Sequence, residues 1–307
     1  MVQMPAYLAW MGGSLALSCL MYGLMARKCW GGRGAARTAL WTCLLSGLLG
    51  AVCARLGYVL LRIDIFPWGN PLRAVTEWDV NTLSYYGGAA GVALGAALAA
   101  GSTGKPVKEA LGLFAPAGAL LAALARFGEG FLGMLGVGMY LEDGFFPLAV
   151  RFTWDGEWFE SYLAVFVLEG VFSLAACALS LVHRKDSDRF RRTVFYLCLP
   201  QILLESLRMQ SISWLFVRAE QLTCFLICEG ILVALALQSG RRGPGRWTAP
   251  VIGLAVCAVV IVGEFALDGK ISLGERDIPP LAIYGVEALG LAAMAWAEHH
   301  EHRMRLR

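Results

Sequence analysis

The chain has 307 residues, of which 58% are hydrophobic and 16% are charged, and its mean hydropathy is +0.60. Soluble domains are nearer to half apolar and a quarter charged, so this composition excludes an ordinary soluble domain. The net charge of +3 is small, and we expect membrane lipids, and no nucleic acid, among the partners of the chain.

The apolar residues are concentrated in blocks of about 20, the length that crosses a hydrocarbon core of about 30 Å. These blocks predict an all-α polytopic membrane protein with about nine transmembrane helices. The first block is not expected to be a signal peptide, because its positive charges, Arg27 and Lys28, follow the apolar stretch. The predicted spans are residues 6–26, 39–61, 83–101, 108–125, 160–182, 193–207, 219–238, 249–267 and 281–297.

The sign of the charge alternates from one predicted loop to the next. Basic residues mark the cytoplasmic side of a membrane, so we predict a cytoplasmic C-terminus and an external N-terminus in a bacterial cytoplasmic (inner) membrane. The basic residues of the odd-numbered loops and the tail include Arg27, Lys28, Arg33, Arg37, Lys105, Lys108, Arg184, Arg189, Arg241, Arg246 and Arg303. The acidic residues of the even-numbered loops are Asp64, Glu77, Asp79, Glu142, Asp143, Asp155, Glu157, Asp268 and Asp277.

Four charged residues lie within or at the ends of predicted spans, all on the outer side. Arg55 is in the second span, Arg126 ends the fourth, and Glu205 and Arg208 end the sixth, three residues apart on one helix face. An arginine inside a membrane helix costs at least about 2.5 kcal/mol, and its fork suits phosphate oxygens. We therefore predict a site for an anionic phospholipid headgroup near the outer leaflet. Snorkelling to the interface and a structural ion-pair network are the alternatives.

Two further features concern contacts between helices. Gly87, Gly88, Gly91 and Gly95 are spaced so that several share a helix face, which predicts close helix packing. Glu264 lies deep in the eighth predicted span, and we expect it to pair with a neighbouring helix.

Several stretches between residues 40 and 235 resemble, in order, the motifs of one family of membrane enzymes. Residues 54–60 read A-R-L-G-Y-V-L, and residues 205–208 give an E-x-x-R that is followed by Gln221 and Gly230. The other similar stretches are residues 71–72, 78–79, 84–91, 125–128 and 168–170. Taken together, the chain resembles the prolipoprotein diacylglyceryl transferases.

This resemblance implies an enzyme that transfers a diacylglyceryl group from phosphatidylglycerol to the lipobox cysteine thiol of exported lipoprotein precursors. It implies Arg126 and Arg208 as catalytic phosphate donors, with Glu205 either as the base or as the support of Arg208. The substrate-binding residues that it implies are Arg55, Tyr86, Gly87, Gly88, Glu129 and Gln221. No metal or nucleotide motif is recognisable in the sequence, which agrees with a transfer that uses no cofactor.

The chain also departs from the family pattern. Tyr86 replaces a family histidine and is a poor base near neutral pH. Glu129 replaces a signature asparagine, and it is either a base or a solvated loop carboxylate. Met134 stands where the pattern has a glutamate, and no Q-L-Y-E motif is recognisable around residues 160–165. The histidines His183, His299, His300 and His302 are all in predicted cytoplasmic segments. These departures leave the two arginines in place and concern the catalytic step and the protein substrate.

The predicted organisation is a seven-helix transferase-like core (1–240), followed by two additional transmembrane helices with a basic cytoplasmic tail (241–307). Two other functions fit parts of the pattern: a related lipid-modifying transferase with another acceptor, and a non-catalytic membrane protein that binds or transports lipid. A transporter should carry polar residues through the midplane of the membrane. The ionisable residues of this chain instead gather near the predicted outer face.

Overall fold

A computed structural model describes residues 3–62, 82–142, 144, 146–154, 158–183, 188–211, 213–214, 217–239, 243–267 and 279–305. The motif at residues 71–79 and most of the acidic external residues lie outside this set. The chain divides into two compact units. The first unit comprises Met1–Val194 and Arg208–Ile212, and the second comprises Phe195–Leu207 and Ser213–Arg307.

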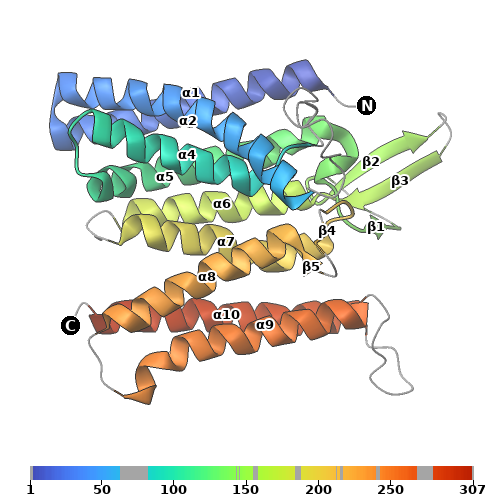
Figure 1. Cartoon of the computed structure of the whole chain (residues 1–307). Helices are drawn as coiled ribbons and strands as arrows, with labels where there is room; N and C mark the ends of the chain where they lie inside the picture. Colours follow the sequence, from blue (N-terminus) through green and yellow to red (C-terminus); the bar gives the residue numbers. More distant parts are fainter. Residues whose placement is uncertain are drawn as a thin grey trace, which may run out of the picture. The chain divides into compact units, whose positions relative to one another are not determined.

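The first unit is a bundle of long helices that carries a small sheet at one end (Figure 1). Helix α7 begins in this unit and ends in the second one. The helices are α1 (Met4–Trp30), α2 (Gly32–Leu61), α4 (Tyr85–Ser102), α5 (Val107–Gly128), the 3-10 segment η2 (Glu129–Gly136), α6 (Val165–Val182) and α7 (Arg189–Leu207).

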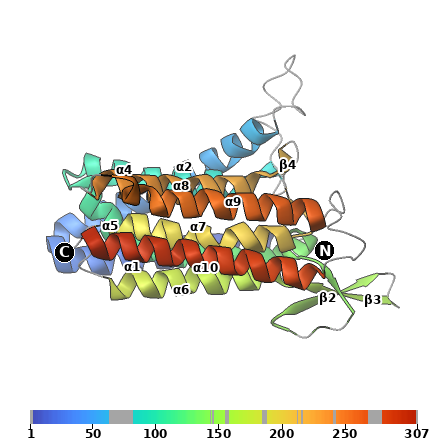
Figure 2. The ribbon, with the colours of Figure 1, turned by 90° about the horizontal axis from the view of Figure 1, so that it is seen from below.

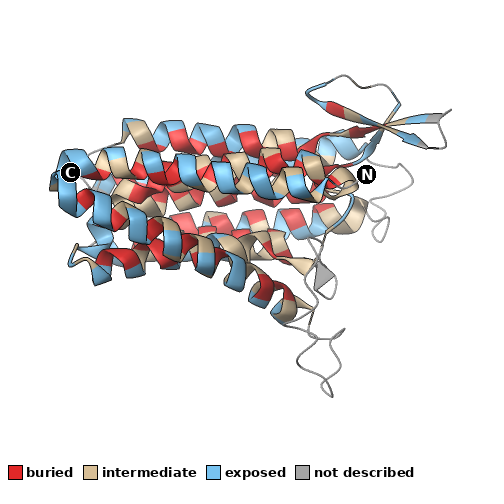
Figure 3. Cartoon of the chain, turned by 90° about the horizontal axis from the view of Figure 1, so that it is seen from above, coloured by how far each residue is buried: buried red, intermediate tan, exposed pale blue. Residues whose placement is uncertain are grey.

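Helix α2 turns its polar side chains inward and its apolar side chains outward. Thr38, Thr42 and Ser46, four residues apart, are fully buried, and the Ser46 hydroxyl donates to the Val92 carbonyl of α4 at 2.9 Å. The exposed side chains on α2 include Leu40, Leu44, Leu48, Leu56 and Leu60. Figure 3 shows that exposed and buried positions alternate along the helices. Outward leucines and inward hydroxyls are typical of a helix whose surroundings are lipid.

Glycines bring α2 and α4 into backbone contact. A Cβ atom built on Gly95 would lie 2.6 Å from the Leu45 carbonyl carbon, and one on Gly91 would overlap the Leu49 carbonyl. Both glycines are therefore required for this approach, which confirms the close packing that their spacing predicts.

Between η2 and α6 the chain forms a three-stranded antiparallel sheet in the order β1-β3-β2. Its strands are β1 (Tyr140–Leu141), β2 (Ala149–Trp154) and β3 (Trp158–Leu163). Phe152 faces Glu160 across the β2–β3 pair. The span predicted from residue 160 is therefore wrong at its start, since α6 begins at Val165. Residues 158–163 are rich in aromatic side chains, which favour a strand.

The second unit contains the end of α7, α8 (Ala219–Gln238), α9 (Thr248–Leu267) and α10 (Pro280–Arg305), with a short hairpin before α8 and a 3-10 turn before α9. Helices α9 and α10 lie side by side in Figures 1 and 2. The hairpin and the turn are β4 (Ser213–Trp214), β5 (Val217–Arg218) and η3 (Pro244–Trp247).

Each predicted span coincides with a helix, apart from differences of up to eight residues at the ends. Within the described residues, 7 helices are long and apolar enough to cross a membrane. Helices α4 and α7 are not among them: α4 is rich in alanine and glycine, and α7 carries three arginines and Glu205. The chain is thus an all-α polytopic membrane protein with a small sheet, and nine crossings and their orientation stay predictions.

Candidate functional site

The last turn of α5 carries Arg126, whose side chain is only 2% exposed. Its terminal nitrogen Nη1 donates to Glu129 Oε1 at 2.6 Å, and its Nε lies 3.4 Å from Glu169 Oε2. Glu129 begins η2, and Glu169 lies in the second turn of α6. A buried guanidinium is tolerated only where carboxylates compensate its charge, and here two different elements supply them.

Arg208 approaches the same two carboxylates from another part of the chain. Its Nε and Nη2 donate to the two oxygens of Glu169 at 3.0 and 2.6 Å, and Nη2 also bonds to Glu129 Oε2. The backbone of Arg208 pairs with Gly138, and the next amide, at Met209, donates to Val137 O at 3.1 Å. These backbone bonds fix where the guanidinium enters the first unit.

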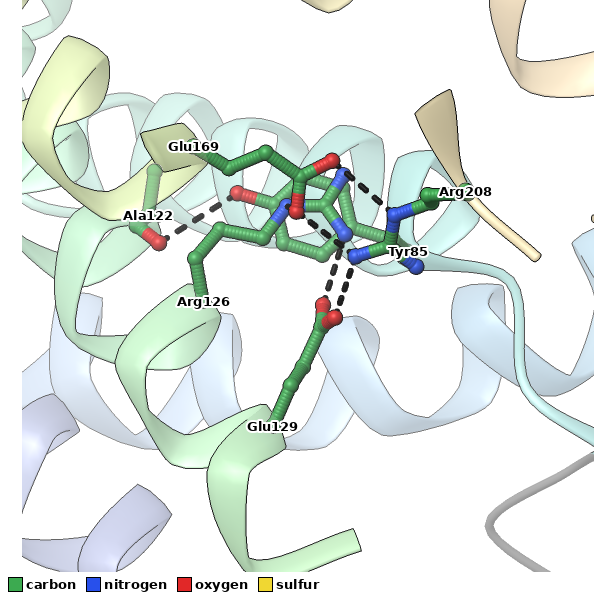
Figure 4. Close-up of polar contacts among 6 residues, drawn as sticks. All are labelled: Tyr85, Ala122, Arg126, Glu129, Glu169 and Arg208. Atoms are coloured by element: carbon green, nitrogen blue, oxygen red, sulfur yellow. Dashed lines mark hydrogen bonds and ion pairs between the residues drawn. The ribbon is translucent and has the colours of Figure 1, made fainter. Parts of the chain in front are cut away.

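We call these four residues the arginine–glutamate square: Arg126, Glu129, Glu169 and Arg208. Figure 4 shows each carboxylate placed between the two guanidinium groups. The two positive and two negative charges balance. Burial alone lowers the pKa of the Arg208 guanidinium, but the carboxylates of Glu129 and Glu169 raise it well above its ordinary value. Arg208 is therefore a cation.

Tyr85 supports the square from the start of α4. The guanidinium carbon of Arg126 lies 3.6 Å from the centre of the Tyr85 ring, which is a cation–π contact. The Tyr85 hydroxyl donates to the Ala122 carbonyl of α5 at 3.5 Å (Figure 4). One face of the Arg126 guanidinium is thus covered by the ring, while its edge meets the carboxylates.

The structure brings together Arg126, Arg208 and Glu129 of the predicted site. Glu129 is not a solvated loop carboxylate, since it is 9% exposed and bonds to both arginines. The prediction that Glu205 and Arg208 share a helix face is wrong, because α7 ends at Leu207, before Arg208. Arg55 is buried elsewhere on α2, where it donates to the Thr82 carbonyl at 3.0 Å and stacks on Tyr58.

The predicted residues Tyr86, Gly87 and Gly88 lie in the first turn of α4. Ser84 caps this helix, and its hydroxyl oxygen accepts the Gly87 amide at 3.2 Å. A Cβ atom on Gly87 would overlap the Cys53 carbonyl of α2, so this glycine is needed for helix packing. Its role in substrate binding stays a prediction.

Glu205 and Gln221 belong to the second unit. Glu205 is 1% exposed, and Nη1 of Arg218 donates to its backbone carbonyl at 2.6 Å. Gln221 Nε2 donates to the Ile202 carbonyl and to Ser206 Oγ, both at 2.9 Å. These two residues are buried and bonded, but their catalytic and binding roles stay predictions.

The sequence did not assign Glu169 or Tyr85 to the site. Glu169 carried a signal, since it is an acidic residue inside the apolar stretch of α6 and belongs to the L-E-G at residues 168–170. Tyr85 is next to Tyr86. The resemblance assigned Tyr86 to the site, where it replaces a family histidine. The sequence cannot show which of two adjacent tyrosines contacts an arginine more than 40 residues away.

The chain has a multi-pass membrane fold. Its candidate site consists of buried arginines and carboxylates, which are suited to bind charged groups. The sequence profile of the prolipoprotein diacylglyceryl transferases matches residues 1–237. The chain therefore belongs to the prolipoprotein diacylglyceryl transferase family. It is a transferase of lipoprotein biosynthesis that moves a diacylglyceryl group from a lipid donor to a lipoprotein precursor. A search of curated proteins finds no match.

Proposed function

We propose that the lipid donor is phosphatidylglycerol and that the acceptor is the lipobox cysteine thiol of an exported precursor. The observation that carries this proposal is the arginine–glutamate square. Two buried guanidinium groups converge on the same carboxylates, and the fork of each is suited to phosphate oxygens. A phosphodiester headgroup is the part of a phospholipid that two such groups can hold.

The reaction is a displacement at the carbon of the diacylglyceryl group that bears the phosphate. The cysteine sulfur forms a bond to this carbon, the carbon–oxygen bond to phosphate breaks, and glycerol phosphate leaves with the electron pair. The thiol proton passes to a base, because the thiolate is the nucleophile. Charge grows on the phosphate as the bond breaks, and donors aimed at this charge stabilise the transition state.

Arg126 and Arg208 are the proposed donors. In the structure, their charges are balanced by Glu129 and Glu169. A headgroup that binds the arginines takes over hydrogen bonds that the carboxylates now receive. A carboxylate released in this way can accept the thiol proton, which gives Glu129 a chemical role that its contacts support. Glu205 is the second candidate base.

The orientation predicted from loop charges assigns the square to the outer leaflet of a bacterial cytoplasmic membrane. An exported precursor displays its lipobox at the same face. Residues 1–240 form the proposed catalytic core, and Arg55, Tyr86, Gly88 and Gln221 are proposed to bind the substrates around it.

The test combines purified protein, phosphatidylglycerol and a lipobox peptide, with mass spectrometry of the peptide thiol. We expect the mass of one diacylglyceryl group to be added. Arg126→Ala should lower the rate by at least about 100-fold, the usual effect of removing one donor to developing charge. The matched control is Arg151→Ala, which removes an exposed arginine of β2 in the same unit and should retain the activity.

Two other outcomes have clear meanings. Transfer from phosphatidylethanolamine alone, or to an acceptor other than a cysteine thiol, would replace the proposed donor or acceptor and leave the transferase class intact. Unchanged transfer by folded Arg126→Ala and Arg208→Ala proteins would remove the square from the active site.

A further inference from the structure

Helices α9 and α10 follow the region that matches the transferase family, which ends at residue 237. Helix α9 nevertheless carries Glu264, an acidic residue in the last turn of an otherwise apolar helix. The sequence predicts that Glu264 pairs with a neighbouring helix, and the structure confirms it.

Glu264 receives hydrogen bonds from two other helices of the second unit. Its Oε1 accepts the Ser206 hydroxyl of α7 and lies 3.1 Å from Gln221 Nε2 of α8. Gln221 Nε2 also donates to Ser206 Oγ at 2.9 Å. A relay therefore runs from the Gln221 amide through the Ser206 hydroxyl to the Glu264 carboxylate.

The other carboxylate oxygen of Glu264 lies 3.8 Å from Nε of Arg218. The same guanidinium donates through Nη1 to the backbone carbonyl of Glu205 at 2.6 Å. Glu264 thus reaches the last turn of α7 by two routes, through the side chain of Ser206 and through Arg218. The two attachments fall on consecutive residues, the Glu205 carbonyl and the Ser206 hydroxyl.

We propose that Glu264 is a positioning residue for the transferase, and this inference rests on the proposed roles of Glu205 and Gln221. Glu264 orients the Gln221 amide. It also holds the end of α7 at Glu205, three residues before Arg208. Helix α9 thereby supplies a polar anchor to the catalytic core, although it lies outside the region that matches the family.

The geometry favours positioning over simple packing between helices. Close packing in this unit is provided by small residues, such as Gly263 of α9, which receives the buried side chain of Glu287 from α10. Glu264 instead meets one hydroxyl, one amide and one guanidinium, all at the adjoining ends of α7 and α8. A carboxylate with these contacts fixes the orientation of the hydrogen-bond donors around it, whereas apolar packing does not.

The kinetic test measures kcat and the KM for phosphatidylglycerol of purified variants. Glu264→Ala should lower kcat by about 10- to 100-fold, the range expected when a catalytic group is displaced by about 1 Å, with little change in KM. Glu264→Gln should recover much of this loss, because its amide oxygen can still accept from Ser206. Glu229→Gln, a second carboxyl between α8 and α9, is the matched control and should keep the parental kcat.

A double-mutant cycle with Ser206→Ala tests the route of the effect. If Glu264 acts through Ser206, the double variant should lose little more kcat than Glu264→Ala alone. A Glu264→Ala protein with parental kcat would overturn the positioning role, and losses that multiply would overturn the route through Ser206. The same double-mutant cycle, measured by the thermal unfolding midpoint, tests whether Glu264 and Ser206 are in contact.

The midpoint cycle does not require turnover. If the parental protein transferred no diacylglyceryl group, the proposed function would fail, yet non-additive midpoints would still establish the Glu264–Ser206 contact. If the midpoints were coupled but Glu264→Ala kept the parental kcat, Glu264 would be a structural brace alone. The failure of each proposal can thus be told from that of the other.

Discussion

Arg126 uses both the edge and the face of its guanidinium. The edge meets Glu129 and Glu169, and the face lies on the Tyr85 ring. A lysine would keep the positive charge but would lose the planar fork and much of the stacking. The chemistry of this position therefore depends on the shape of the cation as well as on its charge.

Arg126→Lys should lower the rate of diacylglyceryl transfer by at least about tenfold, because an ammonium lacks the planar fork that holds phosphate oxygens and stabilises the charge that develops on them. Steady-state kinetics of the purified variant against phosphatidylglycerol would measure this. Arg151→Lys on the exposed face of β2 serves as the control. If Arg126→Lys kept full activity, the position would require a charge and nothing more.

The sequence predicted the two arginines of the square, because arginines are rare and costly at the ends of apolar helices. It assigned Glu129 only by alignment with a motif, and it gave Glu169 no role. Carboxylates on η2 and α6 become partners only when the bundle folds. The pairing of Arg208 depends on a backbone bridge to Gly138, which no periodicity in the sequence reveals.

The contact between α2 and α4 shows how an element is placed without large side chains. Gly91 and Gly95 allow the backbone of α4 to touch that of α2. The backbone amide of Ser84, which caps α4, donates to the Ala54 carbonyl of α2 at 2.9 Å. The start of α4, with Tyr85, is therefore positioned by the same helix pair that the glycines bring together.

Gly95→Ala should destabilise the protein by about 1–3 kcal/mol, because the added methyl group meets backbone atoms of Leu45 and Ser46 that cannot rotate away. Thermal unfolding in detergent would measure the change. The control is Gly101→Ala on the same helix, where nothing lies within 4 Å of the new Cβ atom. It should be neutral or slightly stabilising, since alanine favours helix more than glycine does. Equal effects of the two changes would indicate that α2 and α4 are not in contact at Gly95.

Hydrophobic blocks predicted the helices well because the lipid interior imposes both length and composition. They could not predict the sheet between η2 and α6. Strands β2 and β3 are six residues each, and aromatic residues such as Phe159 continue directly into the apolar run of α6. The boundary between strand and helix is set by pairing with β2, which is a tertiary contact.

At the scale of the whole molecule, the distribution of basic residues predicts that the loop before α7 faces the cytoplasm. A tag inserted next to Arg189 should be shielded from membrane-impermeant reagents in intact cells and become reactive after lysis. A tag at Gly156, in the predicted external stretch, should react in both conditions. The reverse pattern would invert the orientation and assign the square to the inner leaflet.

The amino-acid composition predicts that the surroundings of the protein are lipid. It could not predict a function for the last two helices. Glu264 was noticeable in α9 as an acidic residue in an apolar span, but its partners on α7 and α8 are more than 40 residues away in sequence. Their identity follows only from the fold.

The balanced charges of the square also bear on product release. Glycerol phosphate leaves with more negative charge than the headgroup carried, so two arginines alone would retain it. Glu129 and Glu169 are tethered competitors for the same guanidinium groups, at an effective concentration that a free ion in solution does not reach. Under the proposed function, each departing product is displaced by the enzyme's own carboxylates, and the site returns to neutrality before the next lipid enters.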